Sequence, residues 1–362
     1  MDEQDKTIRP ELRLRARGAR SNENGRYEGA RRVVVDDGWD MAEEERLLQT
    51  EVRPERPRSA LSWNRSPDLP FDRSVNPYRG CEHGCIYCFA RPTHAWLNLS
   101  PGLDFETLLI ARPGIGRVLE QEIGRKSYSV APIALGTNTD PYQPVEQRLR
   151  VMREVLEVLA AWRHPVAITT KGALVERDLD LLAPMAAEGL VRVGISVTTL
   201  DAALCRSMEP RAATPARRLE AIRRLSAAGV SVRVMVAPVI PGLTDHELEA
   251  ILAEAKAAGA MAASWIMLRL PREVAPLMRD WLAEKQPGRA ARVMARIREV
   301  RGGLDYDPEW GRRMRGEGPW AELIAQRFAK AVTRLGLGVA LPPLRCDLFR
   351  RPARVGDQLP LF

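Results

Sequence analysis

Asn76-Pro77-Tyr78-Arg79-Gly80-Cys81-Glu82-His83-Gly84-Cys85-Ile86-Tyr87-Cys88-Phe89 is the most informative segment of this 362-residue chain. It holds three of the five cysteines, spaced Cys-x3-Cys-x2-Cys. Five cysteines in a chain of this length exclude a disulfide scaffold, and such a cluster in a cytosolic chain indicates metal or redox chemistry. The two glycines of the segment allow the backbone to wrap closely around a compact inorganic group.

Three thiolates can hold three irons of a four-iron cubane, which leaves the fourth iron open to a ligand that is not protein. Zinc is the main alternative, with His83 or His94 completing a Cys3His set. However, no second Cys or His pair follows the cluster, as zinc sites usually require. Attachment of a c-type haem would need His after Cys88, where Phe89 stands. The spacing therefore favours a [4Fe–4S] cluster, with zinc left open.

Outside the cysteine segment, short apolar runs alternate with amphipathic helical patterns. The expected strands are 74–80, 131–136, 165–170, 191–197, 230–237 and 262–268, and the expected intervening helices include 146–161, 215–228 and 245–258. Thr244 and Glu247 predict a capping box at the start of the last helix. This alternation is typical of a parallel sheet with helical crossovers. The fold class is therefore α/β, a partial (β/α)6 barrel with its chemistry at the C-terminal ends of the strands.

The sequence predicts four regions. They are a flexible N-terminal arm (1–65), the partial barrel (66–270), a helical, Arg-rich C-terminal extension (271–350) and a tail (351–362). The arm mixes charges of both signs with Gly, Asn and Pro, a composition typical of disorder. No segment has the roughly 18 uncharged apolar residues of a membrane helix, and Met1–Arg20 lacks the apolar stretch of a secretory signal. We therefore expect a cytoplasmic protein without a membrane partner.

The net charge of +8 is concentrated near the C-terminus. Residues 1–60 carry a net charge of −1, residues 61–269 carry +2 and residues 270–362 carry +7. A row of arginines on the expected helix 288–301 and the connector after it would neutralise phosphates and bind DNA or RNA. The alternative is an ordinary solvated face. These arginines are Arg289, Arg292, Arg296, Arg298, Arg301, Arg312, Arg313 and Arg315.

The pattern Cys-x3-Cys-x-aromatic-Cys resembles the radical S-adenosylmethionine (SAM) enzymes. The resemblance implies that SAM chelates the fourth iron through its amino and carboxylate groups. The reduced cluster, supplied by an electron donor that the sequence does not identify, then cleaves SAM to a 5′-deoxyadenosyl radical that abstracts hydrogen from the substrate. Tyr87 matches the aromatic position beside the adenine. The partial barrel of the family agrees with the expected strands.

Further motifs, over about 70–350, are similar to the branch that contains spore photoproduct lyase, often labelled "DNA repair photolyase". They are Gly80-Cys81 through Pro92, Gly136-Thr137-Asn138-Thr139-Asp140-Pro141-Tyr142-Gln143-Pro144, Thr170-Lys171, Ile195-Ser196-Val197, Glu209-Pro210-Arg211 and Ala237-Pro238-Val239-Ile240-Pro241-Gly242. The resemblance implies SAM contacts at Lys171 and Ser196, and ligand contacts are also expected of Asn138 and Asp140. The structural alternatives are a solvated surface lysine for Lys171, an ordinary strand-end residue for Ser196, and an Asx-type turn for Asn138 and Asp140. Glu209 and Arg211 either pair with each other or bind the ribose.

The chain departs from the lyase at two positions. The lyase carries a hydrogen-donating cysteine in the segment that corresponds to 135–140, and this chain has no thiol there. Phe89 also replaces the tyrosine that follows the last cluster cysteine of the lyase. Cys205 is either a substitute hydrogen-atom donor or, more in keeping with its sequence context, an inert buried thiol. Cys346 is also expected to be an inert thiol. Spore photoproduct itself is therefore a doubtful substrate, and no catalytic residue is assigned.

Two other classes of function remain open. One is radical modification of a peptide or a small molecule, in which the arginine excess has no role. The other is a zinc-stabilised nucleic-acid-binding module without catalysis.

The final residues Gln358-Leu359-Pro360-Leu361-Phe362 resemble the pentapeptide that binds the bacterial sliding clamp. Such a tail inserts Leu and Phe into an apolar groove while the Gln amide fixes the register. The alternative is that Leu361 and Phe362 pack on the core of this protein. The sliding clamp is therefore an expected partner through Gln358, Leu359, Leu361 and Phe362.

Overall fold

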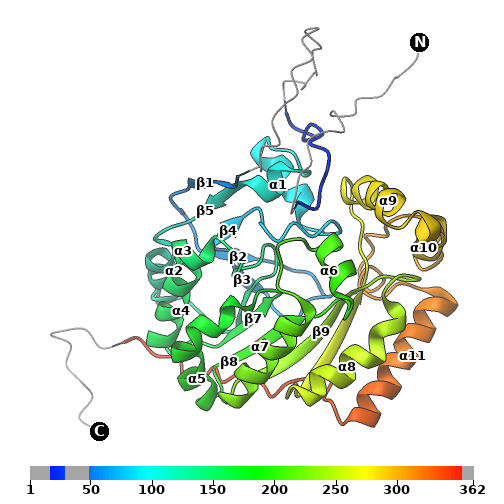
Figure 1. Ribbon diagram of the computed structural model, residues 1–362. Coiled ribbons are helices and arrows are strands. Elements are labelled where there is room, and N and C mark those ends of the chain that lie inside the picture. The colour runs from blue at the N-terminus through cyan, green and yellow to red at the C-terminus, as the bar shows by residue number, and fades with distance from the viewer. Residues whose placement is uncertain (1–16, 29–48, 353–362) are drawn as a thin grey trace, which may run out of the picture.

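The computed structural model describes residues 17–28 and 49–352 (Figure 1). The expected clamp-binding pentapeptide lies outside the described residues. Within them, no helix combines the length and the apolar character needed to cross a membrane.

Six parallel strands form the centre of the molecule. They are β3 (Arg73–Val75), β6 (Ile133–Leu135), β7 (Val166–Thr170), β8 (Val191–Ser196), β9 (Ser231–Val239) and β10 (Ala262–Met267). They pair in chain order, and β2 (Leu61–Trp63) adds an antiparallel edge beside β3. Because β10 and β2 occupy opposite edges of this sheet, the barrel is open. The predicted partial (β/α)6 barrel is confirmed. The expected strand 74–80 differs from the structure, because β3 ends at Val75 and Tyr78–Arg79 form a strand of a separate small sheet.

Helices cover the outside of this sheet (Figure 1). They include α2 (Ile115–Ile123), α4 (Val151–Ala161), α5 (Leu179–Ala187), α7 (Pro215–Ala227), α8 (Leu248–Ala257) and α11 (Gly318–Leu335). Their apolar faces and the strands bury one continuous core, in which Leu156, Val193 and Ile251 are fully buried. This burial is the main stabilising contribution, at roughly 25 cal/mol per Å² of apolar surface. α11 packs on α8 and adds the Arg327–Glu249 ion pair.

Short elements and two further helices lie at the end of the barrel where the strands finish (Figure 1). They are α1 (Asp104–Thr107), α3 (Glu146–Leu149), α6 (Ala202–Met208), α9 (Val274–Lys285), α10 (Pro287–Glu299) and the 3-10 helices Arg91–Leu97, Ala173–Asp178 and Asp245–Glu247. α9 and α10 share a second apolar cluster with Ile86 and Tyr87 of the cysteine segment. The C-terminal extension therefore packs directly against that segment.

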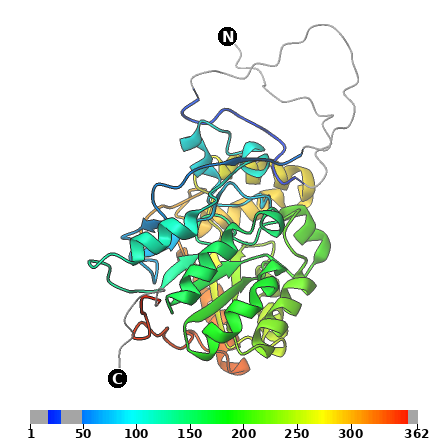
Figure 2. The same cartoon turned by 90° about the vertical axis from the view of Figure 1, so that its left-hand side faces the viewer.

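The region expected to be a flexible arm contributes two packed pieces. β1 (Glu51–Pro54) pairs with β5 (Leu108–Ala111) in a small sheet that also contains β4 (Tyr78–Arg79), and β2 belongs to the main sheet. Residues 17–19 are buried. In Figure 2 this segment, in dark blue, lies at the opposite end of the molecule from the last described residues, in red.

Two helix predictions differ from the structure in detail. The expected helix 146–161 is split into α3 and α4, because Arg150 between them has a φ of 55°. The expected capping box is wrong. Thr244 accepts a hydrogen bond from the backbone of Ile240, and Glu247 accepts from Thr199 and from the backbone of Leu200. Glu247 therefore fastens the loop after β8 to the start of α8.

Candidate functional site

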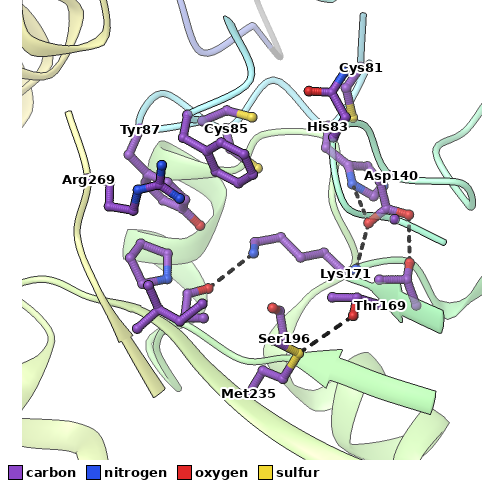
Figure 3. Close-up of a pocket in the computed structure, with 18 of the residues that line it drawn as sticks. Cys81, His83, Cys85, Tyr87, Asp140, Thr169, Lys171, Ser196, Met235 and Arg269 are labelled. Carbon is purple, nitrogen blue, oxygen red and sulfur yellow. Dashed lines mark hydrogen bonds and ion pairs between the residues drawn. The ribbon is translucent and has the colours of Figure 1, made fainter. Parts of the chain in front are cut away.

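One cavity of about 190 Å³ lies at the C-terminal ends of the parallel strands (Figure 3). Every site residue expected from the sequence lines it: Cys81, Cys85, Tyr87, Cys88, Asn138, Asp140, Lys171 and Ser196. The cavity is also lined by His83, which the sequence offered only as a zinc ligand, and by Phe89. Thr169, Met235 and Arg269 line it as well, and sequence reasoning missed these three. The topology of the sheet thus gathers segments that are up to 188 residues apart in the chain, from Cys81 to Arg269, around one space.

The three cysteines lie on a tight loop between β4 and the 3-10 helix Arg91–Leu97. All three are free thiols, and those of Cys81 and Cys85 are buried. Burial raises the pKa of each thiol, so the thiolate forms need a compensating positive charge beside them, which iron supplies. Gly84 has a φ of 65°, and a Cβ there would stand 2.7 Å from the Glu106 carboxylate. The loop therefore requires glycine at this position.

Arg91 holds the loop from its inner side. Its guanidinium donates hydrogen bonds to the carbonyl oxygens of Cys85 (2.9 Å) and Gly84 (3.1 Å), and it pairs with Glu106. Arg91 and Glu106 are both 0% exposed. A planar guanidinium can serve several acceptors in fixed directions at once, which suits the positioning of a loop backbone.

The N-terminal segment covers the loop from outside. The backbone N–H groups of Gly18 and Ala19 donate to the two oxygens of Glu106, each at 2.8 Å. Arg17 donates to the Glu106 carbonyl at 2.9 Å. Gly18 lies so close to the loop that a Cβ on it would stand 1.9 Å from the carbonyl oxygen of Gly84. We call residues 17–19 the strap.

His83 and Asp140 face each other across one side of the cavity (Figure 3). Nδ1 of His83 lies 3.4 Å from Oδ2 of Asp140. Asp140 also accepts from the Lys171 backbone N–H (2.7 Å), the Thr170 hydroxyl (2.6 Å) and the Tyr142 N–H (2.9 Å). Burial alone would raise the pKa of Asp140, but His83 and these donors outweigh it and bring the pKa to about 2. The carboxylate of Asp140 is thus engaged in positioning the loop and the end of β7.

Lys171 extends into the middle of the cavity (Figure 3). Its ammonium group donates to the Ala237 carbonyl at 3.2 Å and lies 5.9 Å from the centre of the Tyr87 ring. No carboxylate of the described residues lies within ion-pair distance of it. Burial lowers the pKa of Lys171, which is the expected effect of removing a cation from water. An anionic ligand group in the cavity would supply the missing partner.

Tyr87 is fixed by a buried carboxylate behind the cavity. Its hydroxyl donates to Glu209, which also accepts from Thr198 (2.9 Å) and pairs with Arg218. The expected pairing of Glu209 with Arg211 is wrong, because Arg211 pairs with Glu82 at 3.1 Å instead. Glu209 does not line the cavity, so it positions the Tyr87 ring through the ring's hydroxyl.

Cys205 lies behind the cavity rather than in it. It is 3% exposed, and its sulfur lies 3.6 Å from Glu209 and 3.6 Å from the Arg218 guanidinium. Cys346 lies at the far end of the barrel, where the neighbouring Arg345 bonds to Gly189 before β8. Among the described residues, the cavity contains no thiol besides the three clustered cysteines.

The positions of the two histidines give no support to a Cys3His zinc site. His94 donates from Nε2 to the Leu108 carbonyl at 3.0 Å and does not line the cavity, while His83 faces Asp140. No three His, Cys, Asp or Glu side chains in the described part of the chain come together as ligands of a single metal ion. The three thiols around one cavity therefore fit the cluster.

Most of the C-terminal arginines are bonded within the chain. Arg296 pairs with Glu299, Arg298 with Asp305, Arg312 with Asp307 and Arg313 with Asp68, and Arg301 and Arg315 donate to backbone carbonyls. Arg289 and Arg292 remain exposed on α10 without an ion pair to a described residue. Of the arginines in the expected row, Arg289 and Arg292 are therefore the two whose side chains have no ion pair or hydrogen bond to a described residue, and phosphate binding by the row stays a prediction.

Comparisons with known proteins point to the same family as the cysteine motif. A family model described as "Radical SAM superfamily" matches residues 75–255. Rv2578c, an uncharacterized protein of Mycobacterium tuberculosis, is 41% identical over 308 residues, which are 81% of this chain and 86% of that protein. MJ0683 of Methanocaldococcus jannaschii, also uncharacterized, is 27% identical over 182 residues, or 50% of this chain and 65% of that protein.

Among solved structures, spore photoproduct lyase complexed with dinucleoside spore photoproduct has a TM-score of 0.57 at 14% identity. The match covers 79% of this chain and 81% of the lyase. At this level of identity the similarity concerns the fold.

Proposed function

Because this chain belongs to the radical SAM superfamily, we propose that Cys81, Cys85 and Cys88 hold its [4Fe–4S] cluster and that SAM binds in the adjoining cavity. The protein is a radical SAM enzyme, and its cofactors are the cluster and SAM. When bound, the cluster supplies the one electron that cleaves SAM to methionine and a 5′-deoxyadenosyl radical, which removes a hydrogen atom from the substrate. The electron comes from a donor protein or reductant outside this chain.

The observation that carries this assignment is Lys171. It is a buried cation that extends into the same cavity as the three thiols, and no described carboxylate pairs with it. The carboxylate of SAM supplies the missing charge, and a charge-assisted bond in a buried site is stronger than a neutral one. Ser196 and Asn138 line the same cavity and offer hydrogen bonds to the polar groups of SAM. Tyr87 lies beside the adenine, held by Glu209.

We propose a nucleic acid as the substrate. The positive excess of the last quarter of the chain supports this choice, and Arg289 and Arg292 are the members of the predicted row free to contact phosphates. A solved structure of the same fold, spore photoproduct lyase, is complexed with a dinucleoside spore photoproduct. Spore photoproduct itself is not proposed here, because the described cavity lacks a thiol to return hydrogen to a product radical.

Anaerobic reconstitution with iron and sulfide tests the cofactor assignment. We expect an absorbance near about 400 nm that is lost in Cys81→Ala and kept in Cys346→Ala, which removes a thiol far from the cavity. Under dithionite, the wild-type protein should convert SAM to 5′-deoxyadenosine and methionine. A colourless protein that retains one zinc per chain would refute the proposal.

The substrate class is tested by adding DNA, RNA or a peptide mixture to the same reaction. Stimulation of 5′-deoxyadenosine formation by DNA or RNA supports a nucleic-acid substrate. Stimulation by peptides alone would replace it with the peptide alternative.

We also propose that the C-terminal tail recruits the enzyme to the bacterial sliding clamp in the cytoplasm through Gln358, Leu359, Leu361 and Phe362. A chain that lacks 358–362 should keep its cluster absorbance and lose clamp binding in a pull-down. Unchanged clamp binding would refute this recruitment, and loss of folding would show that the tail packs on its own chain.

A further inference from the structure

Two neighbouring arginines, one of which lines the cavity, have no carboxylate partner among the described residues. Arg269 follows β10 and lines the cavity, and Arg301 follows α10 and is 2% exposed. No carboxylate of a described residue lies within ion-pair distance of either one. The nearby acids are already used, since Asp68 pairs with Arg313 and Asp307 with Arg312.

The hydrogen-bond donors of these two arginines are also incompletely used. Arg269 makes only long contacts, to the Tyr306 hydroxyl at 3.4 Å and to the Met314 sulfur at 3.8 Å. Arg301 donates to the carbonyls of Leu268 and Arg312. The Nε atoms of both are buried without an acceptor. Burial, together with the positive charge of Arg269, lowers the pKa of Arg301 to about 10. Arg301 is a buried cation beside the partly exposed cation Arg269, and neither has a carboxylate of a described residue within ion-pair distance. An anion bound at Arg269 would offset the repulsion between the two charges.

An exposed aromatic ring lies next to this charge. The guanidinium of Arg269 is 4.9 Å from the centre of the Phe89 ring, which lines the same cavity and is 44% exposed. Phe89 directly follows the last clustered cysteine, and both residues line the cavity, so this ring adjoins the proposed cluster site. In Figure 3, Arg269 lies on the opposite side of the cavity from Asp140 and His83. One side of the cavity thus holds the Asp140 carboxylate, whose hydrogen bonds are satisfied. The other side holds the Arg269 guanidinium, which has N–H donors without an acceptor.

We propose that Arg269 and Phe89 form a substrate subsite at the mouth of the cavity, in which Arg269 binds a phosphate oxyanion and Phe89 stacks on the base beside it. This inference rests on the proposed function for the position of the reacting groups, and it names the residues that select the substrate. A guanidinium binds a phosphate through two parallel hydrogen bonds, and an aromatic ring stacks on any base.

The surroundings favour a nucleotide strand over an acidic peptide. A nucleotide presents a flat ring and an oxyanion on one unit, whereas a peptide carboxylate has no ring attached to it. The loop that supplies Tyr306 also exposes Leu304 and Trp310, with 60% and 56% of each side chain open to solvent. Of these two, Trp310 is aromatic, so together with Phe89 it is a second exposed ring on a segment that neighbours Arg269. Aromatic rings combined with cationic side chains are the usual platform for single-stranded nucleic acid.

Binding is tested with the full-length, reconstituted protein, SAM and no reductant, so that no turnover occurs. The probe is a fluorescein-labelled single strand of DNA eight nucleotides long, followed by anisotropy at 50 and 200 mM KCl. We expect Arg269→Ala to weaken binding at least tenfold and to reduce the salt slope by about one. Phe89→Ala should weaken it about fivefold, and Phe89→Tyr should restore most of the loss. Arg345→Ala, which removes the same charge at the other end of the barrel, should change it less than twofold.

Each variant is accepted only with the wild-type absorbance near 400 nm, so loss of folding is not read as loss of binding. Equal effects of Arg269→Ala and Arg345→Ala, or no binding by the wild type, would overturn the subsite. Displacement of the probe by an acidic peptide at equal concentration would overturn the choice of phosphate. SAM cleavage in the same preparation is scored separately. If SAM is not cleaved, the proposed function is refuted. Binding of the probe that depends on Arg269 would still support the subsite in that case.

Discussion

Glu106 and Arg91 form an ion pair in which both side chains are fully shielded from solvent. Arg91 continues from this pair to the carbonyl oxygens of the cysteine loop, and Glu106 continues to the backbone of the strap. One buried pair therefore connects the proposed cluster-binding loop to the N-terminal segment that covers it.

Removal of one partner of this pair should be strongly destabilising. We expect Glu106→Ala to lower the free energy of unfolding by about 3–5 kcal/mol, because it leaves the Arg91 cation buried and unpaired. The measurement is a denaturant unfolding curve, with iron content per chain after reconstitution as a second readout. The control is Arg217→Ala, which breaks a partly exposed pair with Glu176 and should cost no more than about 1 kcal/mol. Similar losses in the two variants would contradict the role of the buried pair.

A methyl group at position 18 should disturb the strap without changing any charge. In Gly18→Ala the new Cβ would stand 1.9 Å from the Gly84 carbonyl oxygen, so the strap must move off the loop. We expect the reconstituted cluster to bleach several-fold faster in air, as followed by the absorbance near 400 nm. Gly288→Ala is the matched control, because a Cβ there meets no atom within 4 Å. Identical bleaching rates in the two variants would show that the strap does not shield the cluster.

Lys171→Ala should separate SAM binding from cluster binding. Loss of a charge-assisted bond worth about 1.5–3 kcal/mol raises a dissociation constant roughly 10- to 150-fold. We therefore expect a KM for SAM raised by that factor, measured by 5′-deoxyadenosine formation, with iron content unchanged. Lys256→Ala removes an exposed lysine bonded to the Gly336 carbonyl and serves as the control. A normal KM in Lys171→Ala would exclude a SAM contact at this residue.

His164 should make the folded state sensitive to acid. It is 0% exposed, donates from Nδ1 to the Pro165 carbonyl (2.9 Å) and accepts at Nε2 from the Tyr128 hydroxyl (2.8 Å). Burial lowers its pKa to about 4, helped by the nearby positive charge of Arg73. The pKa of histidine in the unfolded chain is about 6.5, so below pH 6.5 the unfolded chain binds a proton at His164 that the folded chain does not bind. The stabilisation is complete above pH 6.5, is lost progressively toward pH 4 and does not decline further below it.

The measurement compares denaturant unfolding at pH 6.5 and pH 5.0. His164→Gln keeps a donor and an acceptor but does not titrate, so it should lose about 2 kcal/mol less than the wild type over this interval. His246→Gln, at an exposed position, should behave as the wild type does. An unchanged pH dependence in His164→Gln would mean that His164 is protonated in the folded protein.

The barrel and its cavity were predictable because they are encoded in local patterns. Most of the parallel strands are short, mainly apolar runs, such as Val166–Thr170, and the polar residue directly after such a strand must lie at the catalytic end of the sheet. That reasoning identified Lys171. Arg269, two residues beyond the end of β10, carries the same signal, but it also begins the arginine-rich C-terminal part of the chain, where one arginine does not stand out.

The covering of the cysteine loop was not predictable by this reasoning. The strap is bonded mainly through backbone N–H groups to Glu106, and backbone bonding leaves no mark in side-chain composition. β1 and β4 have only four and two residues, too few for a periodic pattern. The bond from Tyr87 to Glu209 joins residues 122 positions apart, so no local spacing signals it.

The strap also imposes an order on the maturation of the enzyme. Residues 17–19 leave the ribosome well before their acceptor, Glu106, which lies 87 or more residues later in the chain. The cysteine loop is therefore complete before its cover can close. During that interval the three thiols can be reached from the side that the strap later seals, which is the natural moment for iron and sulfide to enter. Closure then converts a loop open to assembly factors into one enclosed by its own chain.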